Sequence, residues 1–475
     1  MSVFSAIQPH IARRISKYNM QNLFNGLLLI IFVLFVLRFI KSLGKYWPVM
    51  IVALYSFAWL LLSTAYVESG VSMADTGSVS YFDFSTLRLL IYILVFFLGV
   101  YFAKRILIDR KSGRRTTAVS PSDAYASSGE ITKSNIISLG LIVVAICDLI
   151  LLVNIVVSGS IMTNSSINRF NFYSTYSKMS IAIYIIYFEY GISLFLGMVS
   201  AFSKSKLQKN LAVVLLAAFL GYLYLTGIQG TEILVVLLFF LIPKLIAVFS
   251  NRDISINKKQ IRRIVIATAL VFALIVLLKY IGLQSTLIYG AENENSFLYR
   301  LLVLQANTWW NTDTFCLNYL PFGDFSQLES EVSAFFSDTE KYDAGIWHLM
   351  QIIMPSSEYD RYLFANATLN AGYPAINVVI YGYIGAAFAC FVDGAVYFCL
   401  GYYLYRKVIQ QQYVSAAVFS VVFFAAYRVI SMGGIWYLGT SLSKFLIFIL
   451  LFVELIRKWS NTKHLHEKER KHADA

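Results

Sequence analysis

Long apolar runs recur along almost the whole chain, and they limit what it can fold into. The hydrocarbon core of a bilayer requires about 20 apolar residues from each helix that crosses it. Hydrophobic residues make up 58% of the chain and charged residues only 14%, whereas soluble domains carry roughly 25% charged residues. The runs are continuous and not alternating, which excludes a membrane β-barrel. The sequence therefore predicts an all-α, polytopic membrane protein.

These runs predict about eleven transmembrane helices and one large loop. The predicted spans are Leu23–Leu37, Val49–Tyr66, Leu89–Phe102, Ile136–Val157, Ile181–Phe202, Leu211–Leu225, Ile233–Val248, Val265–Ile281, Ala375–Tyr405, Val414–Arg428 and Tyr437–Leu455. The predicted units are a basic N-terminal segment (1–21) suited to the membrane surface, a transmembrane bundle (22–282) with a polar linker (104–135), the large loop (283–374), the last transmembrane helices (375–456) and a basic tail (457–475).

The distribution of Lys and Arg predicts the orientation. Basic residues gather in the connections Arg38–Lys45, Lys104–Arg115, Lys204–Lys209, Arg252–Arg263, Arg406–Lys407 and Arg457–Lys471. The alternate connections are poor in them, and Val67–Thr86 has only acids. Because cytoplasmic loops carry the excess of Lys and Arg, the large loop is predicted outside and the linker and C-terminus inside. The net charge of +13 then points to anionic lipid headgroups of the bilayer and to no nucleic acid.

The large loop concentrates acidic and aromatic residues. It holds 11 of the chain's 26 acids against three basic residues, and we expect it to be partly helical. Most of these acids are expected to form a solvated face, as Glu329, Glu331, Asp338 and Glu340 do in this interpretation. The loop must fold without a disulfide framework, because Cys316 is its only cysteine.

A few side chains of the large loop are candidates for chemistry. Asp313, Asp360 and His348 are candidate proton acceptors, that is, catalytic bases. Trp309 and Trp310 are candidates for stacking on sugar rings. An interfacial aromatic belt for the tryptophans and a structural role for His348 are the alternatives.

Arginines on the predicted outer side are the candidate ligands for phosphate. The positive-inside rule disfavours them there, and guanidinium binds phosphate through two parallel hydrogen bonds. The candidates are Arg169, Arg300, Arg361 and Arg428. Each alternatively reaches lipid phosphate or pairs with a nearby acid.

Glu232, at the tip of the tight hairpin Thr226–Glu232, is placed to meet a substrate. The sequence contains no metal or nucleotide motif, so no metal and no cofactor are expected.

Several short motifs occur in a recognisable order. They are Arg169-Phe170-Asn171-Phe172-Tyr173, Thr226-Gly227-Ile228-Gln229-Gly230, Asn370-Ala371-Gly372-Tyr373-Pro374 and Tyr381-Gly382-Tyr383-Ile384-Gly385. With the spans and the large loop, this order resembles the Wzy-type O-antigen or repeat-unit polymerases of bacterial inner membranes, over roughly Asn135 to Glu454. The hairpin departs from that pattern, since Gln229 and Glu232 stand where the family often has an arginine.

The resemblance implies a metal-independent membrane glycosyltransferase. It implies that a growing glycan is moved from undecaprenyl pyrophosphate onto an incoming lipid-linked repeat unit, at the periplasmic face of the inner membrane. Arginines of the outer loops are the family's functional residues, and on this chain they correspond to Arg169, Arg300 and Arg428, with Tyr173 in the first motif. Whether a chain-length regulator is a partner stays open.

Two other functions fit the same features. An O-antigen ligase, or another glycosyltransferase that uses lipid-linked sugars, needs similar phosphate ligands, and His348 in the large loop keeps the ligase open. A flippase or transporter for the lipid-linked glycan is a third interpretation, although the sequence shows no internal repeat. The departing pyrophosphate accumulates negative charge, which fixed guanidinium groups stabilise, so the residues agree with the reaction that the resemblance implies.

Overall fold

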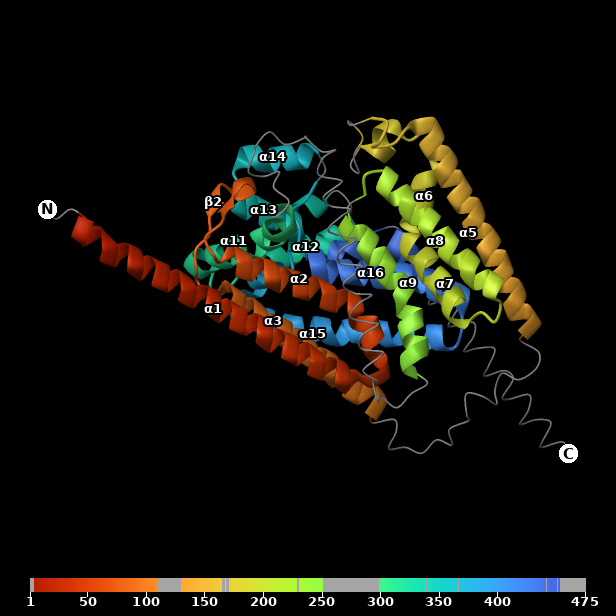
Figure 1. The fold of residues 1–475 in the computed structure, drawn as a ribbon, viewed down its shortest axis with the longest axis horizontal. Coiled ribbons are helices and arrows are strands. Elements are labelled where there is room, and N and C mark those ends of the chain that lie inside the picture. Colours follow the sequence, from red (N-terminus) through yellow and green to blue (C-terminus); the bar gives the residue numbers. More distant parts are fainter. Residues whose placement is uncertain are drawn as a thin grey trace.

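The computed structural model describes residues 4–109, 130–164, 167, 171–228, 230–250, 299–337, 340–365, 367–440, 442–450 and 452. These residues are mostly helical (Figure 1). The first half contains α1 (Phe4–Leu43), η1 (Gly44–Met50), α2 (Ile51–Val67), β1 (Ser72–Met73), η2 (Ala74–Thr76), β2 (Ser78–Val79), α3 (Ser85–Lys104), η3 (Arg105–Asp109), α5 (Glu130–Ser158), η4 (Phe172–Tyr176), α6 (Ile181–Tyr187), α7 (Glu189–Phe202), α8 (Lys206–Leu225) and α9 (Gly230–Ser250). Strands β1 and β2 form an antiparallel hairpin between α2 and α3.

The second half contains the large loop and the last helices. Its elements are η5 (Tyr299–Val303), α11 (Leu304–Tyr319), α12 (Gln327–Phe336), η6 (Glu340–Asp343), α13 (Gly345–Ile353), α14 (Ser356–Phe364), α15 (Ala375–Ile409), α16 (Tyr413–Met432) and η7 (Ile435–Tyr437). Residues 442–450 are helical as well. The described part of this segment, from residue 299 onward, is largely helical.

Seven helical stretches among the described residues are long and apolar enough to cross a membrane. They are Met20–Val67, Ser85–Ile108, Ser134–Ser158, Lys206–Leu225, Thr231–Ser250, Ala375–Ile409 and Tyr413–Met432, and the bent pair α6–α7 is an eighth when counted as one span. The chain is therefore an all-α protein with several membrane-spanning helices. The predicted span Val265–Ile281 lies outside the described residues, and of Tyr437–Leu455 the structure describes a helix only over 442–450 and at 452.

The stretch Met20–Val67 folds back on itself, and so covers the first two predicted spans. The amide Nδ2 of Asn25 on α1 lies 3.1 Å from Oε2 of Glu68, just past the end of α2. The turn between the two helices is η1. Helix α1 begins already at Phe4, so the predicted basic segment and the first predicted span lie on one continuous helix from residue 4 onward.

The predicted hairpin between α8 and α9 is confirmed. Helix α8 ends at Leu225 and α9 begins at Gly230, with Gly227 at φ +81° in the turn. Before it, α6 and α7 meet at Phe188 with a bend of 59°. The span predicted over Ile181–Phe202 is therefore broken, and Glu189 is the first residue of its second part.

The span predicted as one helix over Ala375–Tyr405 is also broken, at Gly382 (φ 65°, ψ −178°). Nδ2 of Asn377 lies 3.1 Å from Oδ2 of Asp393, whereas residues sixteen apart in a straight α-helix are separated by about 24 Å. The segment before Gly382 therefore folds back along the segment after it. Only residues 383–409 form the long helix, which packs beside α3 (Figure 1).

This reversal places Tyr373 deep in the helical bundle. Its ring lies 6.1 Å from that of Phe57 on α2 and 6.4 Å from that of Phe96 on α3, between ring centroids. Both partners lie near the middle of apolar helices. The end of the large loop thus enters the bundle and returns outward through the short helical segment before Gly382.

Gly382 is expected to be indispensable for this reversal. An added Cβ would lie 2.6 Å from the carbonyl carbon of Phe322, and the backbone conformation is one that side chains rarely adopt. We expect Gly382→Ala to lower the free energy of unfolding by about 1–3 kcal/mol, measured by thermal unfolding in detergent. Gly221→Ala is the matched control, because nothing lies within 4 Å of its added Cβ in α8 and helix propensity favours alanine there. Equal melting temperatures for both variants would contradict the reversal.

Candidate functional site

The large loop is anchored to the bundle by a buried ion pair between α11 and α3. Nη2 of Arg88 lies 2.7 Å from Oδ2 of Asp313, and its Nε donates to both carboxylate oxygens at 3.0 Å. The hydroxyl of Tyr383 on α15 donates to Oδ1 of Asp313 at 3.0 Å. Burial raises the pKa of Asp313, and the guanidinium of Arg88 opposes that rise. Three elements therefore meet at one carboxylate.

These contacts decide what the predicted sugar-binding side chains of α11 do. Asp313 and Trp309 are 0% exposed, and Trp310 is 2% exposed. The Nε1 of Trp309 donates to the carbonyl of Ser85, and Trp310 packs in a small cluster with Met73 and Tyr299. Their side chains are therefore closed to a sugar in this structure, and they hold α11 against α3 and the β hairpin.

A second carboxylate joins the large loop to the end of α16. Glu331 on α12 accepts a hydrogen bond from the backbone N–H of Gly345, the first residue of α13, and another from Ile435 N at 3.2 Å. Burial raises the pKa of Glu331. The prediction that Glu331 belongs to a solvated face is wrong, because its carboxylate caps two backbone N–H groups and is 4% exposed.

The Asn370–Pro374 motif meets the turn after α16 beside this contact. A Cβ added at Gly372, in the Asn370–Pro374 motif, would lie 2.0 Å from the carbonyl oxygen of Met432. Gly433 and Gly434 follow at φ 71° and 100°. The large loop and the turn after α16 are thus in backbone contact, and that turn leads to Tyr437.

Arg428 on α16 is the centre of the candidate site. Its guanidinium carbon lies 5.1 Å from the ring centroid of Tyr437 and 5.6 Å from that of Phe424. Nη2 lies 3.8 Å from Oε1 of Glu232 at the start of α9. This separation is an ion pair but too long for a hydrogen bond. Within the described ranges no hydrogen bond engages the guanidinium, and the side chain is 39% exposed.

Glu189 brings a second carboxylate to this place. It interacts electrostatically with both Glu232 and Arg428, and its Oε2 is buried with no hydrogen-bond partner among the described residues. Its position at the start of α7, after the break at Phe188, suits a carboxylate because a helix N-terminus favours negative charge. We call Arg428, Glu232, Glu189, Tyr190 and Tyr437 the Arg428 cluster.

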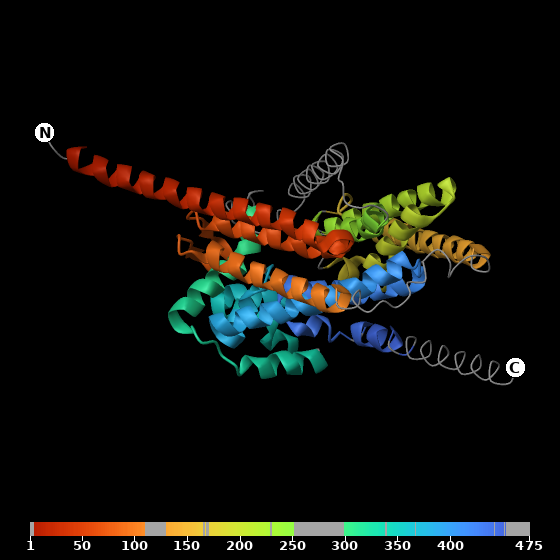
Figure 2. The same ribbon diagram turned by 90° about the horizontal axis from the view of Figure 1, so that it is seen from below.

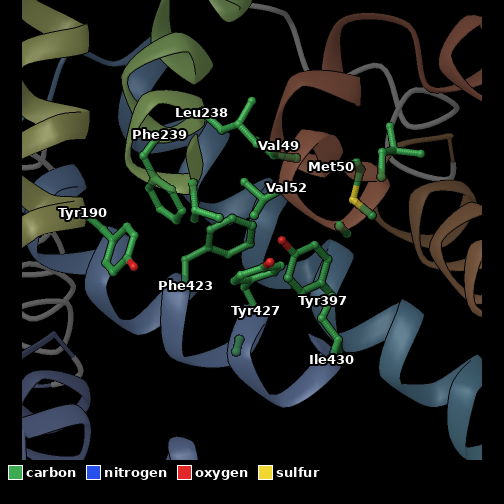
Figure 3. Packing of buried hydrophobic residues seen from close by; sticks show 14 of the residues in the cluster. Val49, Met50, Val52, Tyr190, Leu238, Phe239, Tyr397, Phe423, Tyr427 and Ile430 are labelled. Carbon is green, nitrogen blue, oxygen red and sulfur yellow. The ribbon is translucent and has the colours of Figure 1, made fainter. Parts of the chain in front are cut away.

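Aromatic packing keeps the helices that carry the Arg428 cluster together. The ring of Tyr190 on α7 stacks on Phe424 of α16, with centroids 3.4 Å apart, and lies 5.1 Å from Phe239 of α9. Figure 3 shows Tyr190, Phe239 and Phe423 converging from these three helices, beside Tyr427. The geometry of the cluster is therefore fixed by the bundle core.

Tyr173, from the predicted arginine–tyrosine motif, approaches the same cluster. It interacts electrostatically with Glu189, and its hydroxyl donates to that of Tyr222 on α8 at 3.3 Å. Asn154 on α5 holds the segment between α5 and α6, because its Oδ1 accepts a hydrogen bond from Ser177 Oγ at 3.2 Å. The structure thus pairs Glu232 with Arg428 and places Tyr173 within electrostatic reach of Glu189. Arg169 and the side chain of Arg300 lie outside the described residues.

The remaining candidates lie elsewhere. Helix α14, with Asp360 and Arg361, lies apart from α16 at the edge of the molecule (Figure 1). Asp360 is exposed, and Nη2 of Arg361 forms an ion pair with Glu358 at 2.6 Å. His348 is half-buried on α13, and its burial lowers its pKa. No contact among the described residues joins any of these three to Arg428, and no group of three metal-ligating side chains occurs there.

Sequence reasoning did not name Arg88, which anchors the large loop, and it named Glu189 only as one of several ionisable residues in apolar runs that must face a cavity or a partner. Arg88 follows the acidic connection Val67–Thr86 and therefore lies on the predicted outer side. Arginine is disfavoured there by the positive-inside rule, which is the signal that singled out Arg169. Glu189 is visible as a carboxylate within an apolar run. Its nearness to Arg428 depends on the break at Phe188, which no sequence feature marks.

One comparison with known proteins gives a match. Residues 339–449 match a family of unknown function (DUF6418), which is less than a quarter of the chain. The matched part includes His348 and Arg428 but neither Glu189 nor Glu232. No curated protein and no solved structure matches the chain.

The ion pair between Arg88 and Asp313 generates a stability prediction. Arg88→Met leaves a buried carboxylate without its cation, which costs about 3–5 kcal/mol. We expect a large fall in melting temperature and in the yield of monodisperse protein on size-exclusion chromatography. The double variant Arg88→Met/Asp313→Leu removes both charges, and we expect it to recover most of the loss. A double variant no more stable than Arg88→Met would show that the pair is not what anchors α11.

Proposed function

We propose that this protein is a repeat-unit polymerase, which transfers a glycan from undecaprenyl pyrophosphate onto an incoming lipid-linked repeat unit at the periplasmic face. The observation that supports the proposal most is the Arg428 cluster. A partly exposed guanidinium, held by one carboxylate and two aromatic rings, stands next to a second carboxylate, at the ends of apolar helices. Sugar transfer from a diphosphate donor to a hydroxyl requires both groups: a cation for the departing diphosphate and a carboxylate for the proton of the hydroxyl.

The guanidinium acts on the leaving group. The acceptor hydroxyl attacks C1 of the donor sugar, the bond from C1 to the phosphate oxygen breaks, and undecaprenyl diphosphate departs with the electron pair. Arg428 stabilises the negative charge that develops on this phosphate, with hydrogen-bond donors that the described residues do not engage. Its exposure of 39% leaves room for a ligand.

The carboxylates have different roles in this proposal. Glu232, 3.8 Å from Arg428, orients the guanidinium, which explains a carboxylate at a hairpin where the resembled polymerases often have an arginine. Glu189, the second carboxylate that interacts electrostatically with Arg428, accepts the proton of the acceptor hydroxyl in this proposal. The ring of Tyr437, in the turn after α16, packs against the guanidinium of Arg428.

The central prediction concerns Arg428. In a strain without the chromosomal gene, we expect Arg428→Ala to collapse the ladder of surface polysaccharide on a gel to single repeats, because losing a preorganised donor costs about 10²–10³-fold in rate. From the sequence, we expect the same of Arg169→Ala. Arg428→Lys keeps the charge without the two-pronged geometry and is expected to leave short chains only.

Arg105→Ala is the control, because Arg105 is exposed at the opposite end of α3 from the pair with Asp313. It is expected to keep the full ladder at equal protein level. A full ladder from Arg428→Ala would exclude Arg428 from the reaction. Loss of all glycan from the lipid A core, without single-repeat caps, would favour the ligase, and lipid-linked repeats retained on the cytoplasmic side would favour the flippase.

A further inference from the structure

Helix α12 of the large loop carries an exposed apolar stripe. Val332 and Phe336 are exposed, as is Phe325 in the turn before the helix. At spacings of seven and four residues these side chains share one face, with Glu329 between them, also exposed. The opposite face is buried through Glu331 and Ala334. Three large apolar groups on one face of a short helix need a partner other than water.

This stripe continues onto the membrane-facing surface of α15. Phe322 is 92% exposed, and its backbone touches Gly382. Directly after Gly382 begins the long part of α15, whose side chains Ile384 and Phe388 point away from the bundle and are exposed. The ring centroids of Phe325 and Tyr381 are 5.9 Å apart. Exposed apolar side chains therefore lie both on α15 and on the segment that leads into α12, and the contact between Phe325 and Tyr381 joins the two.

The other end of α12 meets the helix over residues 442–450. Nζ of Lys444 lies 3.5 Å from the carbonyl oxygen of Phe336 and 5.3 Å from the ring centroid of Phe335. Phe445 and Phe448 of the same helix are exposed. In Figure 2, α12 (teal) runs along the lower margin of the molecule, beside α15 and the start of this helix (blue). Exposed apolar side chains thus border α12 at both ends.

We propose that the stripe Phe322, Phe325, Val332 and Phe336 is bound by the interfacial layer of the lipid bilayer, so that this part of the large loop is a membrane-contacting element. Glu329 and Lys444 set the depth, because carboxylate and ammonium groups stay with the headgroups while apolar side chains reach the acyl chains. The partner is lipid and not a protein, because the stripe adjoins lipid-facing side chains on two sides. The proposal is independent of the proposed function.

The test compares two phenylalanines of the large loop that are almost equally exposed. Phe322 is 92% and Phe364, on α14, 95% exposed. The full-length protein is reconstituted into phosphatidylcholine and phosphatidylglycerol vesicles that contain a lipid with a diazirine in its acyl chain. After irradiation, labelled residues are identified by mass spectrometry of peptides. We expect label on Phe322, Phe325, Val332 and Phe336 at a yield comparable to that on Ile384, and only background on Phe364.

Two results would overturn the proposal. Background label on the stripe with full label on Ile384 would place α12 in water or under another chain, and the mass of the protein in detergent would show whether a second copy covers it. Equal label on Phe364 and Phe322 would mean that exposure alone governs the reaction. The double variant Val332→Asp/Phe336→Asp supplies a separate test. It is expected to lose label at Phe325 while Ile384 keeps it, and unchanged label at Phe325 also counts against the proposal.

Discussion

The pairing of Asp313 with Arg88 is the interaction on which the rest of the structure depends. It removes two charges from water, and Tyr383 adds a hydrogen bond from α15, so the start of the large loop is held against two apolar helices. A buried pair of this kind adds little net stability, but removing one partner is costly. It therefore acts as a specific anchor. With α11 held there, Glu331 on α12 can bind Gly345 and Ile435, and the turn that carries Tyr437 over Arg428 is held by the large loop.

Hydropathy predicted most of the helices but not their breaks. Helices α3, α8, α9 and α16 begin and end within a few residues of the predicted spans, because each is one uninterrupted apolar run. The same signal is continuous across Gly382 and Phe188, where the backbone turns. Hydropathy measures the transfer of side chains to lipid and carries no information on the direction of the backbone. It therefore could not predict the reversal that brings Asn377 to Asp393. Gly382, one of the two glycines in Tyr381–Gly385, was the only local sign of the turn.

The candidate site was predicted in part. Arg428 was singled out because arginines are disfavoured on the outer face, and Glu232 because it lies at the tip of a hairpin. The structure shows that the two side chains form an ion pair. Asp313, Trp309 and Trp310 were singled out for their chemistry, yet they are buried. Sequence indicates which groups can react, but whether an acid is buried against a cation or open to a ligand depends on packing between segments far apart in the chain, here Arg88 and Asp313.

The most direct measurement of the central claim is a reaction with purified components. The protein, reconstituted into lipid nanodiscs, receives a lipid-linked repeat unit from the producing organism as both donor and acceptor, and mass spectrometry follows the length of the glycan and the release of polyprenyl diphosphate. The account predicts glycans that grow by whole repeats, with one diphosphate released for each step, and no growth with Arg428→Ala. Growth at the normal rate with that variant, or release of diphosphate without growth, would contradict it.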